Sequence, residues 1–485
     1  VGSWLGIQHE YLPGALGEWY FPSWIDILNN APQRYQRSVL LEGNSPGISF
    51  NILEAGGYLQ NQIELGRGLT VRVGVRVDAP FTLDQPEENE RVRSFFNRST
   101  SDLPSGMVLF SPRLGFNWQT GGNLKTQLRG GIGIFTGQLP YVWLSNAFHN
   151  NGLRSVTQVC YGRRTSDPLE GNTSPPFNPT TPPEGCLAGV PTTVRAVTIF
   201  DDGFVYPQYA KVSASLDREI TSGLSASIGG IFTHSINQVL LRELNILPQE
   251  EALLPLRGYG GTARTHFGMP TDEGFTPIRL LPGYDQVLLA TNGSGDRAWS
   301  VSGELKGDIT RRISFNAAYA YSRSYDRMSL GSVDLISNFG RTPSHGDPND
   351  PPLTPSNFDR PHKAVLALYG TPIPGLERTE IALLYSGESG LPYSYVYRGD
   401  LNGDGYPFLG PASDGNNDLL WVPESAIQLP SSVGTYLRLA AALESDECLK
   451  KFRGRFLTRN GCRAPWQNRL DLRIAHSETL GRAQV

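Results

Sequence analysis

FSPRLGFNWQTGGNLKTQLRGGIGIFTGQLPYVWLSNAFHNN, residues 110–151, is the stretch that decides the fold of this chain. It contains two segments in which apolar and polar residues alternate, joined by a polar turn at residues 120–123. One set of alternate positions is largely apolar and comprises Leu114, Phe116, Trp118, Leu124, Thr126, Leu128, Ile132 and Ile134. The other comprises Arg113, Gly115, Asn117, Lys125, Gln127, Arg129, Gly131 and Gly133. Because successive side chains of a strand point to opposite faces, the stretch predicts a hairpin with one apolar and one polar face.

The same alternation returns along the chain and is clearest at residues 69–78, where four valines alternate with polar residues. The polar positions include Arg72, Arg76 and Asp78. A soluble core cannot bury two arginines and an aspartate along one strand face, so this face must meet water. Further strand candidates are residues 4–11, 19–21, 48–65, 208–218, 224–232, 299–305, 313–321, 362–369, 381–397 and 470–474. Together they predict about a dozen strands.

The connections between these segments alternate between short and long. Short turns are expected at residues 66–68, 120–123, 221–223, 310–312 and 374–375, and long ones, which we expect to lack regular structure, at 82–105, 142–205, 242–296, 327–360 and 398–465. This asymmetry is typical of outer-membrane barrels, which have short periplasmic turns and long extracellular loops. We therefore assign Gly121-Gly122 to a periplasmic turn and the residues after Pro140 to the start of an extracellular loop. Strands of ten or more residues can also cross a bilayer at a tilt.

The composition agrees with a membrane barrel. Hydrophobic residues make up 39% of the 485 residues, mean hydropathy is −0.29, and no run approaches the length of a transmembrane helix. Barrel strands escape that test because only every second residue is apolar. The net charge of −4 and the absence of a basic patch argue against a nucleic-acid partner. The prediction is an all-β, antiparallel transmembrane β-barrel, partial in this chain, with a polar and wide lumen.

Four cysteines fall into two local pairs, Cys160 with Cys186 and Cys448 with Cys462. None has the spacing of a zinc site. Both pairs lie in long connections, which favours disulfides that staple loops in an oxidising compartment. Four unpaired thiols are the alternative.

The stretch 110–152 resembles the barrel of TonB-dependent outer-membrane transporters, and most closely the Oar-like group that carries an N-terminal carboxypeptidase-regulatory-like domain. DLNGDGYPFLGPASDGNNDLLWVP, residues 400–423, and QNRLDLRI, residues 467–474, resemble the same group. The resemblance implies a bacterial outer-membrane protein with a barrel of about 22 strands, a plug domain and an N-terminal box that contacts the TonB complex.

The chain begins at Val1 without a signal peptide and stops at Val485 in mid-pattern. We therefore expect residues 1–485 to be one barrel segment of a longer precursor, from which the plug, the signal peptide and the closing strand are absent. By itself this segment should transport nothing.

No catalytic constellation is present, and the seven histidines are scattered without the spacing of metal ligands. We predict no enzyme activity and no cofactor. The candidate functional residues are lumen-facing charges that could meet a plug or a solute, namely Arg72, Arg76, Arg113, Arg129, Arg469 and Arg473. The alternative is a solvated inner wall with ion pairs to neighbours such as Asp78 and Asp471, and we prefer it.

Asp400, Asn402 and Asp404 match the start of an EF-hand loop, in which oxygens at alternate positions wrap a calcium ion. Pro411 stands where that loop has a bidentate glutamate, although Asp414, Asn416, Asn417 and Asp418 offer further oxygens. A polar turn without a metal is the preferred interpretation.

The leading functional hypothesis is uptake of an external ligand across the outer membrane, with the membrane lipid and the TonB complex as further partners. The identity of the ligand is not readable. An outer-membrane barrel for adhesion or surface organisation, without import, is the second hypothesis. A secreted, glycan-binding β-domain is the third, but few segments remain to form the second sheet that it needs.

Overall fold

The computed structural model of the chain describes residues 2–10, 12, 14–21, 23–121, 124–161, 173–247, 252–254, 262–271, 274–397, 400–406, 417–424, 440–480 and 483–484. Asn123, Pro411, Asp414, Asn416 and the chain end at Val485, which the sequence analysis singled out, lie outside these residues. No helix among the described residues is long and apolar enough to cross a membrane.

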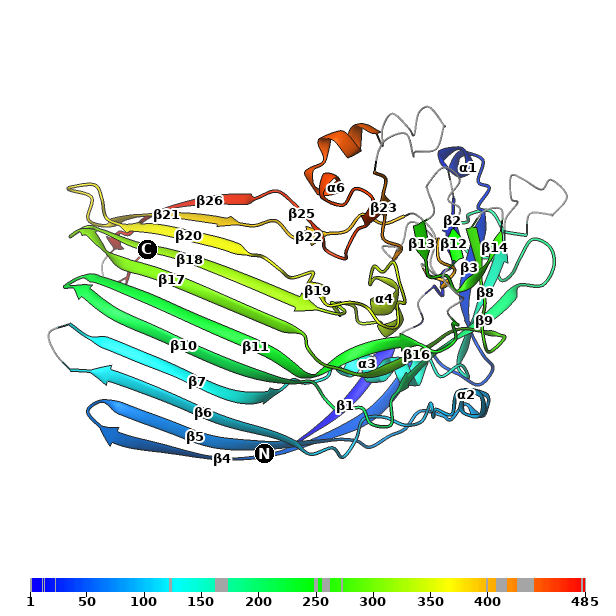
Figure 1. Ribbon diagram of the computed structural model, residues 1–485, viewed down its shortest axis with the longest axis horizontal. Coiled ribbons are helices and arrows are strands. Elements are labelled where there is room, and N and C mark those ends of the chain that lie inside the picture. Colours follow the sequence, from blue (N-terminus) through cyan, green and yellow to red (C-terminus); the bar gives the residue numbers. More distant parts are fainter. Residues whose placement is uncertain are drawn as a thin grey trace.

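Twelve long strands form one curved antiparallel sheet, in which each strand pairs with the next in chain order (Figure 1). They are β1 (Gly2–Glu10), β4 (Gly47–Gly66), β5 (Leu69–Thr82), β6 (Leu109–Thr120), β7 (Thr126–Thr136), β10 (Gln208–Thr221), β11 (Leu224–Glu243), β17 (Arg297–Thr310), β18 (Ile313–Asp326), β20 (His362–Gly370), β21 (Thr379–Glu388) and β26 (Gln467–His476). Among the described residues, β1 pairs only with β4 and β26 only with β21. The sheet is therefore an open part of a barrel, as the alternating sequence predicts.

The turn between β4 and β5 needs residues that tolerate a left-handed backbone. Between β4 and β5, Arg67 has φ 48° and Gly68 has φ 79°. A Cβ on Gly68 would also overlap the main-chain oxygen of Gln119 on β6, so this position requires glycine. The short turns lie at one end of the sheet and the long connections gather at the other (Figure 1).

The strand registers keep the two faces separate from one strand to the next. Val73 lies opposite Leu114, Leu114 opposite Ile132, and Ile132 opposite Val212. These four side chains are 45–58% exposed, although all are apolar. An exposed apolar band that crosses several strands is what a lipid-facing barrel surface presents. The division of residues 110–151 into two faces is therefore confirmed.

The expectation that the long connections lack regular structure is wrong. Residues 82–105 contain helix α2 (Glu90–Phe96), capped by the side chain of Asn89, and residues 142–205 contain most of helix α3 (Tyr141–His149). Strands β2 (Glu18–Tyr20), β3 (Arg34–Leu40), β8 (Ser155–Tyr161), β9 (Thr192–Phe200) and β16 (Tyr284–Gly293) pair in that order and join the far end of β11. Of these, β2 matches the expected strand 19–21, whereas the other four were not predicted.

The hydrophobic core lies among these connections and not between the long strands. Its largest cluster includes Phe50, Leu144, Phe148, Phe339 and Tyr406. The helices α3 and α4 (Leu335–Gly340) contribute to it, and a second cluster surrounds Val92 of α2. The core therefore holds a compact layer over one end of the barrel wall (Figure 1).

One C-terminal strand is shorter than expected, whereas β26 is longer than the predicted strand 470–474. The predicted strand 381–397 ends at Glu388, because Gly390 follows and the chain turns away into β22 (Pro392–Tyr393). The remaining short elements are α1 (Trp24–Leu28), β12 (Ala252–Leu254), β13 (Thr262–Arg264), β14 (Gly268–Thr271), β15 (Gly274–Pro277), β19 (Thr354–Pro355), β23 (Trp421–Val422), α6 (Glu447–Lys451), β24 (Arg455–Phe456), β25 (Cys462–Arg463), β27 (Thr479–Leu480) and β28 (Ala483–Gln484).

Candidate functional site: the polar wall and its pocket

The largely polar face of the sheet continues from β4 to β26, with a few apolar residues such as Phe50 and Leu384 on it. The registers place Arg72, Arg76, Arg113, Arg129, Arg469 and Arg473 all on this face. Phe50 belongs to the same face of β4 and stacks on Phe148 of helix α3, with ring centroids 4.8 Å apart. The helix and the core around it therefore cover one end of the polar face, while the apolar face is left open.

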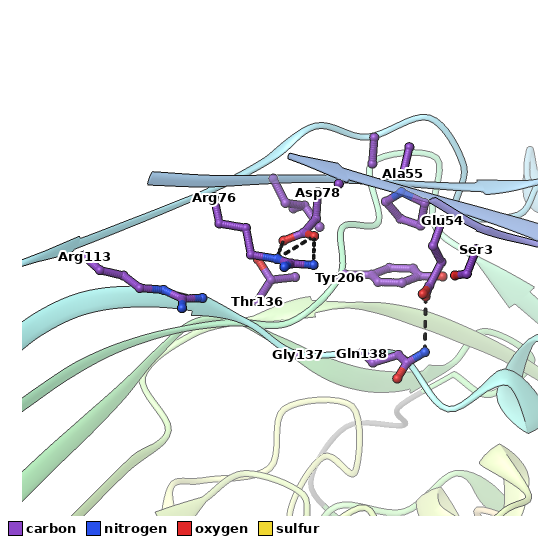
Figure 2. Close-up of a pocket in the computed structure, with 14 residues that line it drawn as sticks. Ser3, Glu54, Ala55, Arg76, Asp78, Arg113, Thr136, Gly137, Gln138 and Tyr206 are labelled. Atoms are coloured by element: carbon purple, nitrogen blue, oxygen red, sulfur yellow. Dashed lines mark hydrogen bonds and ion pairs between the residues drawn. The ribbon is translucent and has the colours of Figure 1, made fainter. Parts of the chain in front are cut away.

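A pocket of about 450 Å³ lies on the polar face where the long strands meet this layer (Figure 2). Arg76 and Asp78, two residues apart on β5, both point into it. The guanidinium of Arg76 donates from Nη2 and Nε to the Asp78 carboxylate at 2.7 and 2.9 Å. The pair is partly exposed, so water screens it and it adds little stability. The ion pair places two charged groups at the wall of the pocket.

Opposite this pair, Glu54 of β4 connects the barrel wall to helix α3. The Oε1 atom of Glu54 accepts a hydrogen bond from Nε2 of Gln138 at 3.2 Å and another from the Tyr141 hydroxyl. Burial, together with this bond to a carboxylate, raises the pKa of Tyr141 to about 12. The pocket rim is therefore a hydrogen-bonded contact between strand and helix.

Two further lining residues of the pocket are not paired with a carboxylate. The Arg113 guanidinium lies 4.9 Å from the centre of the Phe135 ring, which also carries Lys211 at 5.4 Å. Tyr206 is buried, and its hydroxyl has no hydrogen-bond partner among the described residues. Burial raises the pKa of Tyr206 above the ordinary tyrosine value. The pocket therefore offers a cation and an unused hydroxyl beside two engaged carboxylates.

Away from the pocket, the arginines of the polar face make mostly local contacts. Arg129 reaches Asp217 at 3.2 Å, and Arg469 reaches Asp471 at 2.9 Å. Arg72 donates to Gln62 at 2.9 Å. Within the described part of the chain, Arg473 has no side-chain partner. Ion pairs thus occupy Arg76, Arg129 and Arg469, whereas Arg113 and Arg473 have no carboxylate partner among the described residues.

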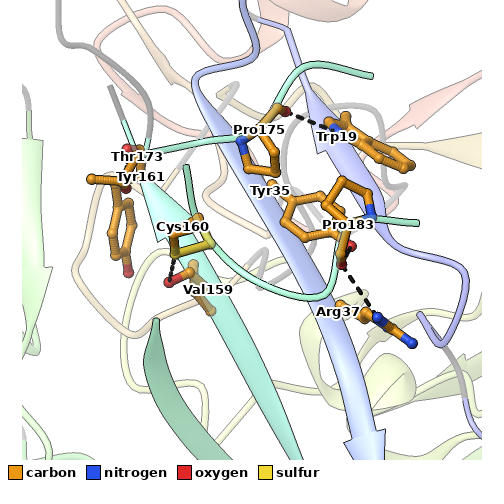
Figure 3. Close-up of a disulfide and its surroundings, with 10 residues drawn as sticks. Trp19, Tyr35, Arg37, Val159, Cys160, Tyr161, Thr173, Pro175 and Pro183 are labelled. Carbon is orange, nitrogen blue, oxygen red and sulfur yellow. Dashed lines mark hydrogen bonds between the residues drawn. A yellow bond between two sulfur atoms is a disulfide. The ribbon is translucent and has the colours of Figure 1, made fainter. Parts of the chain in front are cut away.

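The first cysteine pair lies in the layer above the barrel (Figure 3). Cys160, at the end of β8, is joined to Cys186, with their Cα atoms 5.4 Å apart. The segment near Cys186 also accepts hydrogen bonds at its main-chain oxygens. Trp19 donates to Pro175 at 3.1 Å and Tyr35 to Pro183 at 2.7 Å. The disulfide thus fixes a long loop onto the β3–β8 sheet.

The second pair joins Cys448 to Cys462, with Cα atoms 5.5 Å apart. It connects helix α6 to β25 within a small core around Leu449 and Leu457. Asp400, Asn402 and Asp404 lie in the same long connection and are largely withdrawn from solvent. Across the described residues, no group of three histidine, cysteine or carboxylate side chains forms a ready-made metal site.

Sequence reasoning missed that Glu54, Gln138 and Tyr206 line one pocket and that Tyr141 donates to Glu54. Glu54 occupies one of the polar-face positions of its strand. That position was the only sign in the sequence that it could belong to a site. The contacts of Gln138 and Tyr141 with Glu54 span more than 80 residues of sequence, so no local pattern could reveal them.

A one-sided apolar sheet that exposes its apolar band, with a polar opposite face and a layer of long connections, defines an outer-membrane β-barrel protein. Residues 22–480 match the family described as "Outer membrane beta barrel domain", and the chain belongs to that family. It is therefore a protein of the outer membrane. No curated protein matches the chain.

Several solved structures are similar to the chain, at low identity. The siderophore receptor PirA from Pseudomonas aeruginosa has 12% identity and a TM-score of 0.35 over 73% of this chain and 49% of that one. The outer membrane transporter YddB from Escherichia coli has 11% identity and a TM-score of 0.40 over 76% and 40%. A mutant of the ferric enterobactin receptor PfeA from Pseudomonas aeruginosa has 12% and 0.35 over 74% and 38%. The chain spans half or less of the length of these three structures.

Proposed function

We propose that the chain is the barrel part of a TonB-dependent outer-membrane transporter of the Oar-like group, which takes up an external ligand. The observation that carries the proposal is the sheet of twelve paired strands, whose largely polar face includes the pocket at Arg76 and Glu54. Small barrels fill their interior with side chains, whereas a wide barrel with a polar inner face needs water or an internal plug.

The arrangement of the connections supports the direction of transport. In outer-membrane barrels the short turns face the periplasm and the long loops face the exterior. The layer of long connections would then form the mouth, and the pocket would lie just inside it. An external ligand would meet the loops first and the pocket next. In this proposal residues 1–485 are one barrel segment, and the plug and the TonB-binding box belong to the rest of the full-length protein.

The six arginines of the polar face would line the lumen. Arg76, Arg129 and Arg469 form ion pairs with carboxylates, so their main role would be to keep the lumen wall hydrated. Arg113 and Arg473 have no carboxylate partner in the described part of the chain and are the candidates to contact a plug or an anionic part of the ligand.

A barrel for adhesion is the second candidate function. The observation that favours it is the disulfide-fixed sheet of β2, β3, β8, β9 and β16, which would present a stiff external surface to a macromolecule. Import additionally requires contact with TonB, and adhesion does not.

The test uses the full-length protein, purified in detergent, and the periplasmic domain of TonB. Import predicts a complex by isothermal titration calorimetry that disappears when the upstream TonB-contacting segment is deleted. In parallel, cells with that deletion should still attach to surfaces as the wild type does. No complex with TonB, together with attachment lost on removal of the whole protein, would refute import in favour of adhesion.

A further inference from the structure

The connection between β21 and β26 contains a buried group of acidic and amide side chains that neither transport nor adhesion uses. Asn402, Asp404, Asn417 and Asp418 are each at most 1% exposed. The group is built into the layer above the barrel. The main-chain oxygen of Asn402 accepts from Phe267 N at 2.6 Å, and that of Asn417 accepts from Ser344 N at 2.7 Å. The main chain at Asn402 and at Asn417 is therefore anchored to other segments of this layer.

Carboxylates outnumber cations in this group. Arg264, itself buried, pairs with Asp418 at 2.7 Å. Arg279 donates to the main-chain oxygen of Asp404, but its ion pair is with Asp285 at 2.7 Å. Asp400 and Asp404 thus have no arginine or lysine bonded to their carboxylates among the described residues. A buried excess of negative charge is costly unless a cation joins it.

A second observation, independent of the charges, also points to a cation in this group. The Asn417 side chain lies against the Asp404 carboxylate, because its Nδ2 donates to Asp404 Oδ2 at 2.7 Å. Its other polar atom, Oδ1, is buried and has no hydrogen-bond donor among the described residues. A buried carbonyl oxygen without a donor calls for a water or an ion. Amide and carboxylate oxygens are the ligands of calcium.

The order of residues fits a calcium loop. Asp400, Asn402 and Asp404 hold the alternate oxygen positions, and Gly405 falls where such loops have an invariant glycine. Gly405 has φ 86°, and a Cβ there would collide with the Arg279 guanidinium. The Asp400 carboxylate accepts from the N–H groups of Gly403 and Gly405 at 2.6 and 2.8 Å, which closes the loop around it.

We propose that Asp400, Asn402, Asp404, Asn417 and Asp418 form a Ca²⁺ site in the loop layer. Because these side chains are not yet arranged as a ready-made ligand group, the ion would draw the Asp404 and Asn417 oxygens toward one centre. Bound Ca²⁺ would tie residues 400–406 to residues 417–418 and so fix the wall of the mouth between β21 and β26. The proposal does not depend on whether the barrel imports or adheres.

The test is thermal unfolding of the purified full-length protein in 5 mM CaCl₂, in 5 mM MgCl₂ and in EDTA, with calorimetric titration of CaCl₂. Extracellular calcium modules bind with Kd of about 10⁻⁴ to 10⁻³ M, which sets this concentration. We expect one Ca²⁺ bound at this site and a rise of several degrees in Tm that Mg²⁺ does not reproduce. No response to CaCl₂ relative to EDTA, or an equal response to MgCl₂, would overturn the proposal.

Variants locate the site. Asp404→Asn should abolish the response to CaCl₂. Asp350→Asn is the matched control, since Asp350 is 79% exposed and pairs with Arg327 outside the group, and it should keep the full response. Asn417→Ala changes no charge and replaces Asp404→Asn as the test variant if Asp404→Asn does not fold. A full calcium response in both Asp404→Asn and Asn417→Ala would place the ion elsewhere and refute this site.

Discussion

Val73 on β5 lies directly opposite Leu114 on β6, and both side chains are about half exposed although they are apolar. Their neighbour Arg72 points to the other face and donates to Gln62. A lipid environment explains why the apolar pair is open and the arginine is inside. We expect Val73→Arg to lower the free energy of unfolding by about 2–4 kcal/mol if it lies near the bilayer midplane, while Arg72→Ser changes it by under about 1 kcal/mol.

The measurement for this pair is urea unfolding of the two variants and the wild type, each folded into lipid vesicles. Arg72→Ser is the matched control, because it alters the adjacent residue of the same strand. Equal losses of stability in the two variants would mean that the two faces have been assigned the wrong way round.

Tyr206 of the pocket and Tyr141 of helix α3 should respond oppositely to removal of the hydroxyl. Tyr206 is buried with no partner for its hydroxyl among the described residues, so Tyr206→Phe should raise the free energy of unfolding by about 1 kcal/mol. The hydroxyl of Tyr141 donates to Glu54, so Tyr141→Phe should lower it by about 1–2 kcal/mol. Denaturant unfolding measures both. A loss of stability in Tyr206→Phe would indicate a partner for that hydroxyl.

The two faces of the sheet were predictable because most of its long strands keep an alternation of apolar and polar residues with a period of two. Arg113 and Leu114 could be assigned to opposite faces without knowing which residues they pair with. Helix α3 was not predictable in this way. Its residues Trp143, Leu144 and Phe148 are all buried, so it shows no polar stripe, and it follows a proline that reads as the start of a loop.

The pocket was less predictable than the faces. Glu54, Arg76 and Gln138 come from three separate segments, and their meeting depends on the curvature of the sheet and on where α3 packs. The buried acidic group shows the opposite case. The order of Asp400, Asn402 and Asp404 was visible in the sequence, while the burial of Asn417 and Asp418 beside them required the fold.

Asp296, just before β17, should make stability depend on pH. It is 9% exposed, and burial, with Asp326 nearby, raises its pKa from 3.8 to about 6. The folded state therefore binds this proton more tightly than the unfolded state, so stability falls as pH rises from about 4 to about 6 and stays lower above that.

Asp296→Asn removes the titrating group and should remove this fall. We expect the variant to be more stable than the wild type by about 1–3 kcal/mol at pH 7.5 and nearly equal to it at pH 4. The Tm of both proteins between pH 4 and pH 8 is the measurement. A variant that is less stable at pH 7.5 would show that the carboxylate is stabilised in the folded state.

The Cys160–Cys186 disulfide should stabilise the loop layer and leave the barrel wall unchanged. It closes a loop of 26 residues, for which the chain-entropy estimate is about 3 kcal/mol. The hydrogen bonds from Trp19 and Tyr35 still hold the segment, so a Cys160→Ala/Cys186→Ala variant should loosen it without unfolding it. Hydrogen exchange should therefore speed up in β8 and β9 and stay unchanged in β5 and β6. The Cys448→Ala/Cys462→Ala variant is the control and should affect only α6 and β25. Faster exchange in β5 or β6 of the first variant would mean that wall and loop layer unfold as one unit.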